Sequence, residues 1–263
     1  MTLVVGFVAN DRAVMAADSQ GTEADGTRSV VEKIWCERGL LFGYAGTQAV
    51  RDNLKEAIVY RLSSATPGEL QDRKVVEQKI CGVSKTVLEA MYANYVSDIG
   101  ERPKDALGGQ LLVMGCGANS EGHWLLEVDR DNTPTYYTEP GFHAAGSGSP
   151  AAQITMALLQ SYVPQELSLR QLQALAYRTV SASVRVLAQY VSEPIAVWTC
   201  DGKGSFVQAT NTEIQDIGGL IEAWLTVERE SILSVEPPDD NDEDKPPLPA
   251  PPEAGAQSSA KTV

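Results

Sequence analysis

The first eighteen residues place the strongest constraint on the fold of this chain. Two apolar runs, at residues 3–8 and 13–18, each have the length of a short strand, and the turn-forming pair Asn-Asp lies between them. An antiparallel hairpin of this kind returns Asp18 to the neighbourhood of Thr2. The sequence therefore predicts a carboxylate beside the start of the chain.

Thr2 carries both groups that a self-activating nucleophile needs. Methionine aminopeptidases remove Met1 when the next side chain is small, so we expect Thr2 to become the first residue. An N-terminal threonine combines a hydroxyl nucleophile with an α-amine, whose ordinary pKa of about 7.7 to 8.0 suits a general base. Many proteins begin Met-Thr, so a catalytic role for Thr2 depends on further residues.

Lys33 lies within residues 29–36, which the pattern predicts as a third strand. A lysine ammonium beside the hydroxyl of Thr2 favours the alkoxide form of that hydroxyl. A carboxylate such as Asp18 beside the lysine would keep it charged and oriented. Together these residue types predict a catalytic group of Thr2, Asp18 and Lys33.

Several residues, taken with their neighbours, resemble the proteasome β-subunit and HslV family. They are Thr2 behind Met1, Asp18 in Ala-Ala-Asp-Ser, Lys33 in Glu-Lys-Ile, Gly46 in Tyr-Ala-Gly-Thr, and Ser147 in Ala-Gly-Ser-Gly-Ser. Members of this family are N-terminal-nucleophile (Ntn) threonine peptidases, and the resemblance spans residues 2–233. Residues 177–183 contain no carboxylate and no propeptide precedes Thr2, so the chain resembles the bacterial HslV and Anbu branches more than a true proteasome subunit.

The resemblance implies a fold, an assembly and further site residues. The fold is α/β (α+β), a four-layer αββα sandwich of two antiparallel sheets. Gly46 would donate its amide to the oxyanion, and Val31, Tyr44, Gln48 and Asp52 would surround the side chain preceding the cut. The assembly would be a ring or spiral of identical subunits that receives unfolded polypeptides, with an ATPase unfoldase as a possible partner.

The hydrophobic pattern of the rest of the chain agrees with two sheets covered by helices. The predicted strands are residues 40–45, 110–116, 123–129, 134–138, 195–200 and 205–209. The predicted helices begin at Thr47, before Val76, at Ser149, after Ser168 and near Glu213. Because Ser147 comes directly before a helix that starts at Ser149-Pro150, its hydroxyl is a candidate partner for the amine of Thr2.

Composition excludes several other classes of protein. The 263 residues are 43% hydrophobic and 21% charged, with a net charge of -14, which is typical of a soluble globular chain. No apolar run is long enough to span a membrane and no signal peptide is evident, so we expect a cytoplasmic protein. Lys and Arg are not clustered, which argues against nucleic acid as a partner. Cys36, Cys81, Cys116 and Cys200 lack metal-ligand spacing, so we expect buried thiols, no metal and no cofactor. With His123 and His143 as the only histidines, a zinc hydrolase or a Ser-His-Asp enzyme is an unfavoured interpretation.

The C-terminal segment differs in composition from the rest. From Ser234 onward it contains seven acidic residues, two lysines and many prolines. Such a segment cannot build a packed core, so we expect a folded domain at residues 1–233 and a disordered acidic, proline-rich tail at 234–263. Docking of this tail to a partner is the alternative interpretation.

Two other functional classes fit the same residues. One is an Ntn amidase that acts on a small molecule through Thr2. The other is a catalytically silent, structural subunit of a proteasome-like ring, against which the presence of both Thr2 and Lys33 argues.

Overall fold

The hairpin predicted at the start of the chain is present in the structure, a computed structural model. Strand β1 (Val4–Ala9) pairs antiparallel with β2 (Arg12–Asp18), and Val4 lies opposite Ala17. The predicted turn residue Asn10 lies outside the described residues. Those described are 2–9, 11–22, 27–99, 108–117, 122–139, 141–160, 166–187, 191–200 and 204–234. They form one compact unit as far as Glu222, and a second unit starts at Ala223.

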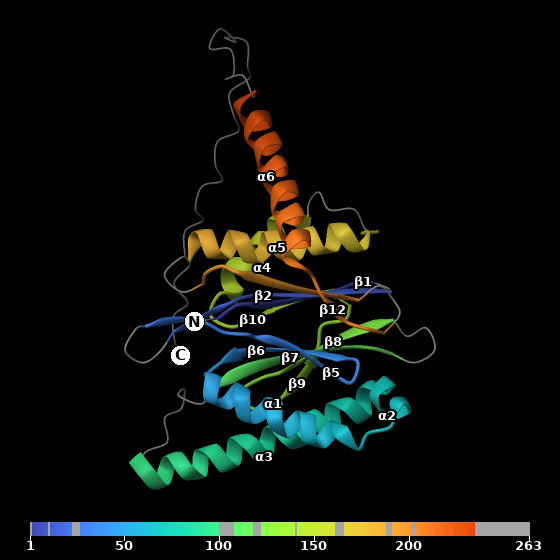
Figure 1. Cartoon of the computed structure of the whole chain (residues 1–263), viewed down its shortest axis with the longest axis vertical. Helices are drawn as coiled ribbons and strands as arrows, with labels where there is room; N and C mark the ends of the chain where they lie inside the picture. The colour runs from blue at the N-terminus through green and yellow to red at the C-terminus, as the bar shows by residue number, and fades with distance from the viewer. Residues whose placement is uncertain are drawn as a thin grey trace, which may run out of the picture. The chain divides into compact units, whose positions relative to one another are not determined.

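Two five-stranded antiparallel sheets make up the centre of the first unit (Figure 1). The first has the order β10-β1-β2-β11-β12 and adds β10 (Phe142–Ala145), β11 (Ile195–Cys200) and β12 (Val207–Gln208) to the hairpin. The second has the order β5-β6-β7-β8-β9 and consists of β5 (Ile34–Glu37), β6 (Leu40–Gly46), β7 (Gly109–Cys116), β8 (His123–Val128) and β9 (Pro134–Tyr136). A separate two-stranded ribbon joins β3 (Gln20–Thr22) to β4 (Arg28–Val30).

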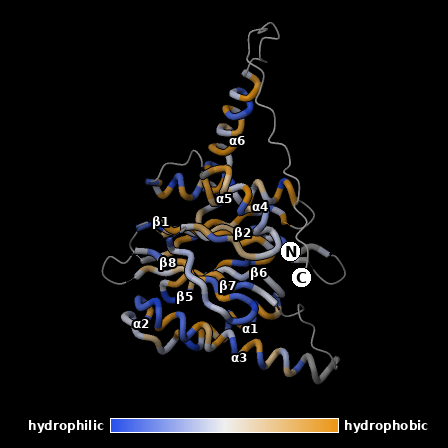
Figure 2. Tube along the Cα trace, turned by 180° about the vertical axis from the view of Figure 1, so that it is seen from behind, coloured by the Kyte–Doolittle hydropathy of each residue, from blue (hydrophilic) through white to orange (hydrophobic). Residues whose placement is uncertain are grey.

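Side chains alternate along the strands of the second sheet and so contribute to two cores. Leu41 and Met114 face the first sheet, where they pack with Met15 and other buried residues. Their neighbours Phe42 and Val113 face the opposite way and pack under helices. This period of two is the reason that one sheet of apolar strands can be buried on both faces. Figure 2 shows the resulting concentration of hydrophobic positions in the strands.

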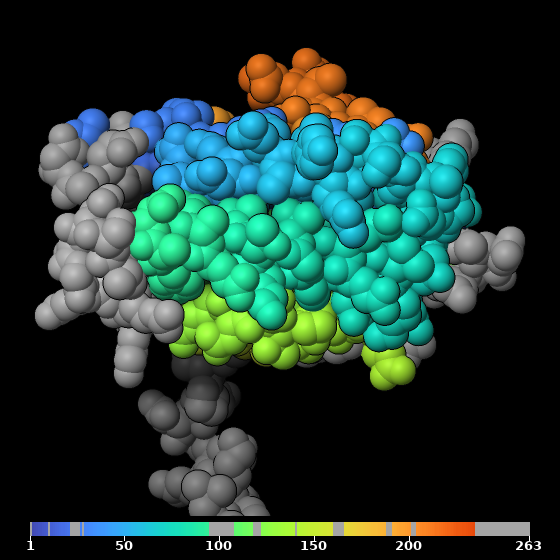
Figure 3. All heavy atoms as spheres, turned by 90° about the horizontal axis from the view of Figure 1, so that it is seen from below, coloured from blue at the N-terminus to red at the C-terminus, as the bar shows by residue number. Residues whose placement is uncertain are grey.

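Helices cover the outer face of each sheet. On the second sheet lie α1 (Gln48–Ser63), α2 (Pro67–Gln71) and α3 (Arg73–Ile99). Figure 3, seen from below, shows α1 and α3 side by side on this face. On the first sheet lie α4 (Ser149–Gln160) and α5 (Leu169–Val186), of which α5 packs against β1, β2 and β11. None of the described helices combines the length and apolar character that a membrane crossing requires.

The strand predicted at residues 29–36 is interrupted, and the interruption contains Lys33. Strands β4 and β5 belong to different sheets, so the chain must cross from the ribbon to the second sheet between them. Backbone hydrogen bonds hold this crossing on both sides: Val31 N donates to Ser19 O at 2.8 Å, and Tyr44 N donates to Lys33 O at 3.0 Å. The prediction of one continuous strand was therefore wrong, because two sheets share the segment.

Two short elements, α2 and β10, were not predicted from the sequence. The helix predicted to begin before Val76 is preceded by a further helix, α2, whose first residue is Pro67. Thr66 accepts from the amide of Glu69, whose carboxylate accepts from the amide of Thr66, and this capping box starts a helix at a proline. Strand β10 was missed as well, since it is short and gains its position from pairing with β1.

Helix α6 (Asn211–Leu233) begins in the first unit and continues into the second. Of its apolar residues, Ile217 and Ile221 are buried. Three others are only half-buried: Ile214, Trp224 and Leu225. The proposed tail lies outside the described residues from position 235 onward, so its disorder stays a prediction.

Candidate active site

Asp18 lies at the centre of the hydrogen bonds around the start of β1. Its Oδ1 accepts from the amide of Leu3 at 2.8 Å and from Nζ of Lys33 at 2.7 Å, and its Oδ2 accepts from the amide of Gln20 at 3.1 Å. The pairing of β1 with β2 brings these groups together, because Asp18 ends β2 next to the residue that follows Thr2. The carboxylate thus fixes both the lysine and the first strand.

Lys33 and Asp18 form an ion pair that is almost fully removed from water. The exposed fractions of their side chains are 4% and 0%. Burial lowers the pKa of Lys33 below its ordinary 10.5, while the charge of Asp18 and the hydrogen bond to it act in the opposite direction. An ammonium held in this way can stabilise an alkoxide or oxyanion next to it more strongly than an exposed lysine can.

Helix α1 supports the crossing segment that carries Lys33. The Arg51 guanidinium donates to the backbone oxygen of Glu32 and, through Nε and Nη2, to Oδ1 of Asp52 at 2.9 and 2.7 Å. Arg51 therefore ties the residue before Lys33 to the first turns of the helix. Asp52, its partner in this ion pair, keeps 54% of its side chain exposed.

The loop after β10 contacts Thr2 from the opposite side. The nitrogen of Thr2 donates to Oγ of Ser147 at 3.1 Å, and the amide of Gly148 donates to the backbone oxygen of Thr2 at 3.2 Å. Gly146 has a φ of +97°, and a Cβ there would lie 2.2 Å from that same oxygen. Only glycine permits this close approach of loop to strand.

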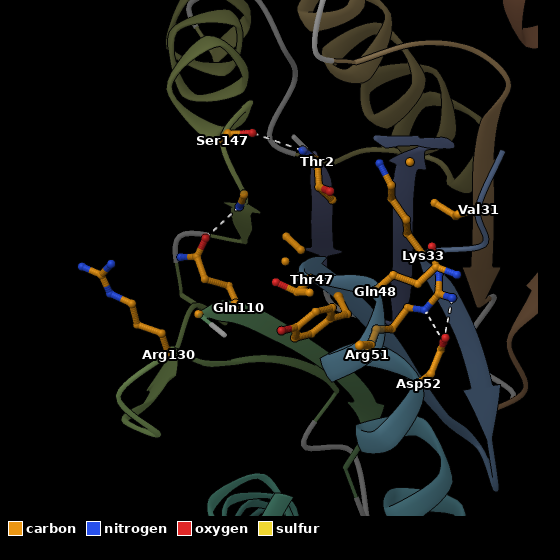
Figure 4. Close-up of a pocket in the computed structure, with 18 of the residues that line it drawn as sticks. Thr2, Val31, Lys33, Thr47, Gln48, Arg51, Asp52, Gln110, Arg130 and Ser147 are labelled. Carbon is orange, nitrogen blue, oxygen red and sulfur yellow. Dashed lines mark hydrogen bonds and ion pairs between the residues drawn. The ribbon is translucent and has the colours of Figure 1, made fainter. Parts of the chain in front are cut away.

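These groups meet in a cavity of about 1050 Å³ (Figure 4). The cavity is lined by residues of the second sheet, of α1, of strand β3 and of the segments next to β1 and β10. It includes every predicted site residue except Asp18: Thr2, Val31, Lys33, Tyr44, Gly46, Gln48, Asp52 and Ser147. Asp18 is buried behind Lys33 and does not line the cavity. The structure thus brings the predicted residues together in space.

Tyr44 and Gly109 form the wall of the cavity next to Gly46. Tyr44 is 3% exposed, and its hydroxyl would lie 2.0 Å from a Cβ built on Gly109 and 2.7 Å from one built on Gly46. Both positions therefore need glycine. Burial raises the pKa of Tyr44, and within the described part of the chain its hydroxyl has no hydrogen-bond partner.

Some residues of the cavity were not found from the sequence: Arg51, Gly108, Gly109, Gln110, Asp129 and Arg130. Gly109 and Gln110 begin β7, and Gly109 lies opposite Gly46 in the pairing of β6 with β7. The pair of glycines before a buried strand was the available signal for a close approach at this point.

The histidines and cysteines lie in other surroundings. His123 is 3.1 Å from Sγ of Cys200, and both side chains are buried. The other cysteines are only half-buried, in contrast to the prediction of buried thiols. Among the described residues, no group of three or more His, Cys, Asp or Glu side chains is arranged to hold a metal ion.

Comparison with known proteins finds similarity in structure but not in sequence. No family model matches the chain, and no match to a curated protein is found. The structure of the Gly-1 mutant of Anbu from Hyphomicrobium sp. strain MC1 is similar, with a TM-score of 0.67, 14% identity, and coverage of 91% of this chain and 100% of that chain. Anbu, the ancestral β-subunit, from Yersinia bercovieri gives a TM-score of 0.71 and 13% identity, covering 91% and 99%.

A third similar structure is the helical assembly of the Anbu complex from Pseudomonas aeruginosa. Its TM-score is 0.73 at 14% identity, and the match covers 90% of this chain and 98% of that chain. Identities this low say nothing about shared activity, whereas the scores and coverage describe one architecture. The chain therefore has the fold of the Anbu proteins.

Proposed function

We propose that this chain is a threonine-type endopeptidase of the proteasome and HslV kind, with Thr2 as its N-terminal nucleophile after removal of Met1. The observation that supports this most is the meeting of Thr2 with the buried Lys33–Asp18 pair at one cavity. Few other reactions need a hydroxyl on the first residue, a desolvated ammonium and a serine hydroxyl at the nitrogen of that residue.

The reaction would proceed through an ester on Thr2. Its Oγ1 attacks the carbonyl carbon of a peptide bond, and the α-amine takes the hydroxyl proton, directly or through a water molecule. The amide of Gly46 donates to the oxyanion, a type of contact worth about 10²- to 10³-fold in rate. The intermediate collapses, and the leaving amine departs with that proton.

A water molecule then completes the cycle. The α-amine of Thr2 accepts a proton from this water as it attacks the ester carbonyl. Collapse of the second intermediate releases the carboxyl product and returns the proton to Oγ1. Throughout both halves, Lys33 stabilises negative charge at the threonine oxygen, Asp18 holds Lys33, and Ser147 orients the amine.

The substrate side chain before the cut would enter the space between Val31, Tyr44, Gln48 and Asp52. We further propose that the layers described above are the αββα sandwich of Ntn hydrolases. Identical subunits would assemble in a ring or spiral, as the helical assembly of Pseudomonas aeruginosa Anbu suggests. Unfolded polypeptides would be the substrates, delivered by an ATPase unfoldase if one is present.

The test begins with intact mass, which shows whether Met1 is removed. The protein is then treated with an epoxyketone or β-lactone, and the modified residue is mapped by mass spectrometry. We expect an adduct on Thr2, partial activity on casein in Thr2→Ser, and none in Thr2→Ala with unchanged folding.

Other outcomes would favour other functions. An adduct on Ser147 or on a cysteine, with full activity in Thr2→Ala, contradicts the proposal. Hydrolysis of small amides without hydrolysis of casein indicates an amidase. Retention of Met1, with neither activity nor adduct, indicates a structural subunit.

A further inference from the structure

A chain of polar groups connects the second sheet to the loop that carries Ser147. Gln110, at the start of β7, accepts from the amide of Gly146 through Oε1 at 2.7 Å, a bond drawn in Figure 4. Through Nε2 it donates to Oε1 of Glu127 on β8 at 2.6 Å. The side chain of Gln110 thus spans from a buried carboxylate to the backbone one residue before Ser147.

Glu127 faces the imidazole of His143 on its other side. It is 5% exposed, and its Oε2 lies 3.1 Å from Nε2 of His143 on β10. The imidazole of His143 stacks on the ring of Tyr137, with centroids 3.6 Å apart and planes inclined by 14°. Although burial raises the pKa of Glu127, the neighbouring imidazole of His143, with Tyr137 and Gln110, lowers it below its ordinary value.

An ionised Glu127 leaves the amide of Gln110 only one favourable orientation. A carboxylate only accepts hydrogen bonds, so the NH₂ group of Gln110 must face it. The carbonyl oxygen of Gln110 then faces the amide of Gly146, which only donates. A flipped amide would place oxygen against carboxylate and N–H against N–H, and both contacts are repulsive.

From these contacts we propose that Gln110, Glu127 and His143 are positioning residues that hold the 146–147 backbone, and with it the Ser147 hydroxyl, against the nitrogen of Thr2. The inference rests on the proposed function for its catalytic meaning. Gly146 links the polar chain to Thr2. Its amide donates to Gln110, its Cα lies close to the backbone oxygen of Thr2, and the next residue in the chain is Ser147. The polar chain therefore sets the environment of the base through the backbone of Gly146.

The experiment measures the α-amine of Thr2 itself. The full chain is prepared with Thr2 as its first residue. The pH dependence of acetylation of its amine by dilute acetic anhydride is followed by mass spectrometry of the N-terminal peptide. Variants are Ser147→Ala, Gln110→Met and the isosteric Glu127→Gln, and each of the last two is also combined with Ser147→Ala. Lys33 and Asp18, the charged groups beside Thr2, and His143 and Tyr137, which contact Glu127, stay unchanged throughout.

We expect Ser147→Ala to lower the labelling midpoint, because the protonated amine loses an acceptor. Gln110→Met and Glu127→Gln should lower it as well, and neither should add to the effect of Ser147→Ala in the double variants. Peptide hydrolysis should fall on the order of tenfold in Gln110→Met, a part of the roughly 10²- to 10⁴-fold that a general base supplies. The exposed Gln208→Met and Glu89→Gln serve as controls and should change neither quantity.

Additive shifts in the double variants, or midpoints unchanged in both single variants, would overturn the inference. If Gln110→Met does not fold, Glu127→Gln decides alone, since it keeps the shape of the side chain. Labelling needs no substrate, so failure of the proposed function is recognised separately. Non-additive shifts without peptide hydrolysis contradict only the peptidase activity, and hydrolysis with additive shifts contradicts only the positioning role.

Discussion

The two partners of the Lys33–Asp18 ion pair differ in the other hydrogen bonds that they make. Asp18 also accepts from the amides of Leu3 and Gln20. Among the described residues, the ammonium of Lys33 donates a hydrogen bond to Asp18 and to no other side chain. Removing one partner of a buried pair typically costs about 3–5 kcal/mol, because a charge is left unpaired. For Asp18→Ala we expect a loss of that size in the free energy of unfolding, measured by urea denaturation.

Lys33→Met should behave differently from Asp18→Ala. It removes a charge whose burial is itself unfavourable, as its lowered pKa shows, and leaves Asp18 with its backbone donors. We expect a much smaller loss of stability together with loss of peptide hydrolysis. A Lys33→Met protein that hydrolyses casein at the normal rate would remove the lysine from the proposed mechanism, and the exposed Lys85→Met is the matched control.

Glu127 predicts a dependence of stability on pH. Its pKa is lowered in the folded protein from an ordinary 4.5, so the carboxylate stabilises the fold above about pH 4.5. This contribution is lost as the pH falls through the lowered pKa. We expect the difference in free energy of unfolding between the natural chain and Glu127→Gln to be large near neutral pH and to shrink on acidification below 4.5. A difference that is constant across this range would show that the carboxylate has no favourable partners.

At the level of single residues, the sequence predicted those site residues that lie in short, recognisable segments of the chain. Thr2, Asp18 and Lys33 stand in short, recognisable segments near one another in the chain. Gln110 and Glu127 have no such context, because their roles depend on the register of β7, β8 and β10. No local pattern contains that long-range information.

The elements themselves were predicted where the signal was strong. The helix that begins after Ser168 and the strand Ile195–Cys200 occur where the pattern placed them. The two-sheet arrangement also agrees with the order of elements. By contrast, β10 results from pairing with the distant strand β1, which outweighs local propensity. The interruption before β5 arises because β4 pairs with β3 in the ribbon while β5 pairs with β6 in the second sheet.

Helix α5 offers a test at the scale of one element. Ser168 accepts from the amide of Gln171 at 3.3 Å, and the amide of Ser168 donates to Oε1 of Gln171 at 2.8 Å. Ser168→Ala removes one of these bonds at the start of the helix that covers β1 and β2. We expect a loss of about 1 kcal/mol and a lower melting temperature. Ser168→Asp should restore most of it, and an unchanged melting temperature in Ser168→Ala would show that the cap contributes nothing.

At the scale of the whole molecule, the C-terminal segment can be tested by truncation. Its composition predicts that a stop after Leu233 leaves thermal stability and self-assembly largely unchanged. A stop after Thr210 is the contrasting control, because it also removes the buried Ile217 and Ile221 of α6. Thermal stability is measured as the melting temperature and self-assembly by light scattering. A large drop in melting temperature after the stop at Leu233 would show that the segment packs on the folded part.

The contact between Thr2 and Ser147 also determines when the proposed site can form during synthesis. The two residues are 145 positions apart in the chain, and β11, the other neighbour of β2, is translated later still. A nascent chain therefore carries Thr2, the proposed nucleophile, from the beginning but lacks the strands that shape its surroundings. Under the proposed function, the peptidase site would form only after most of the message has been translated.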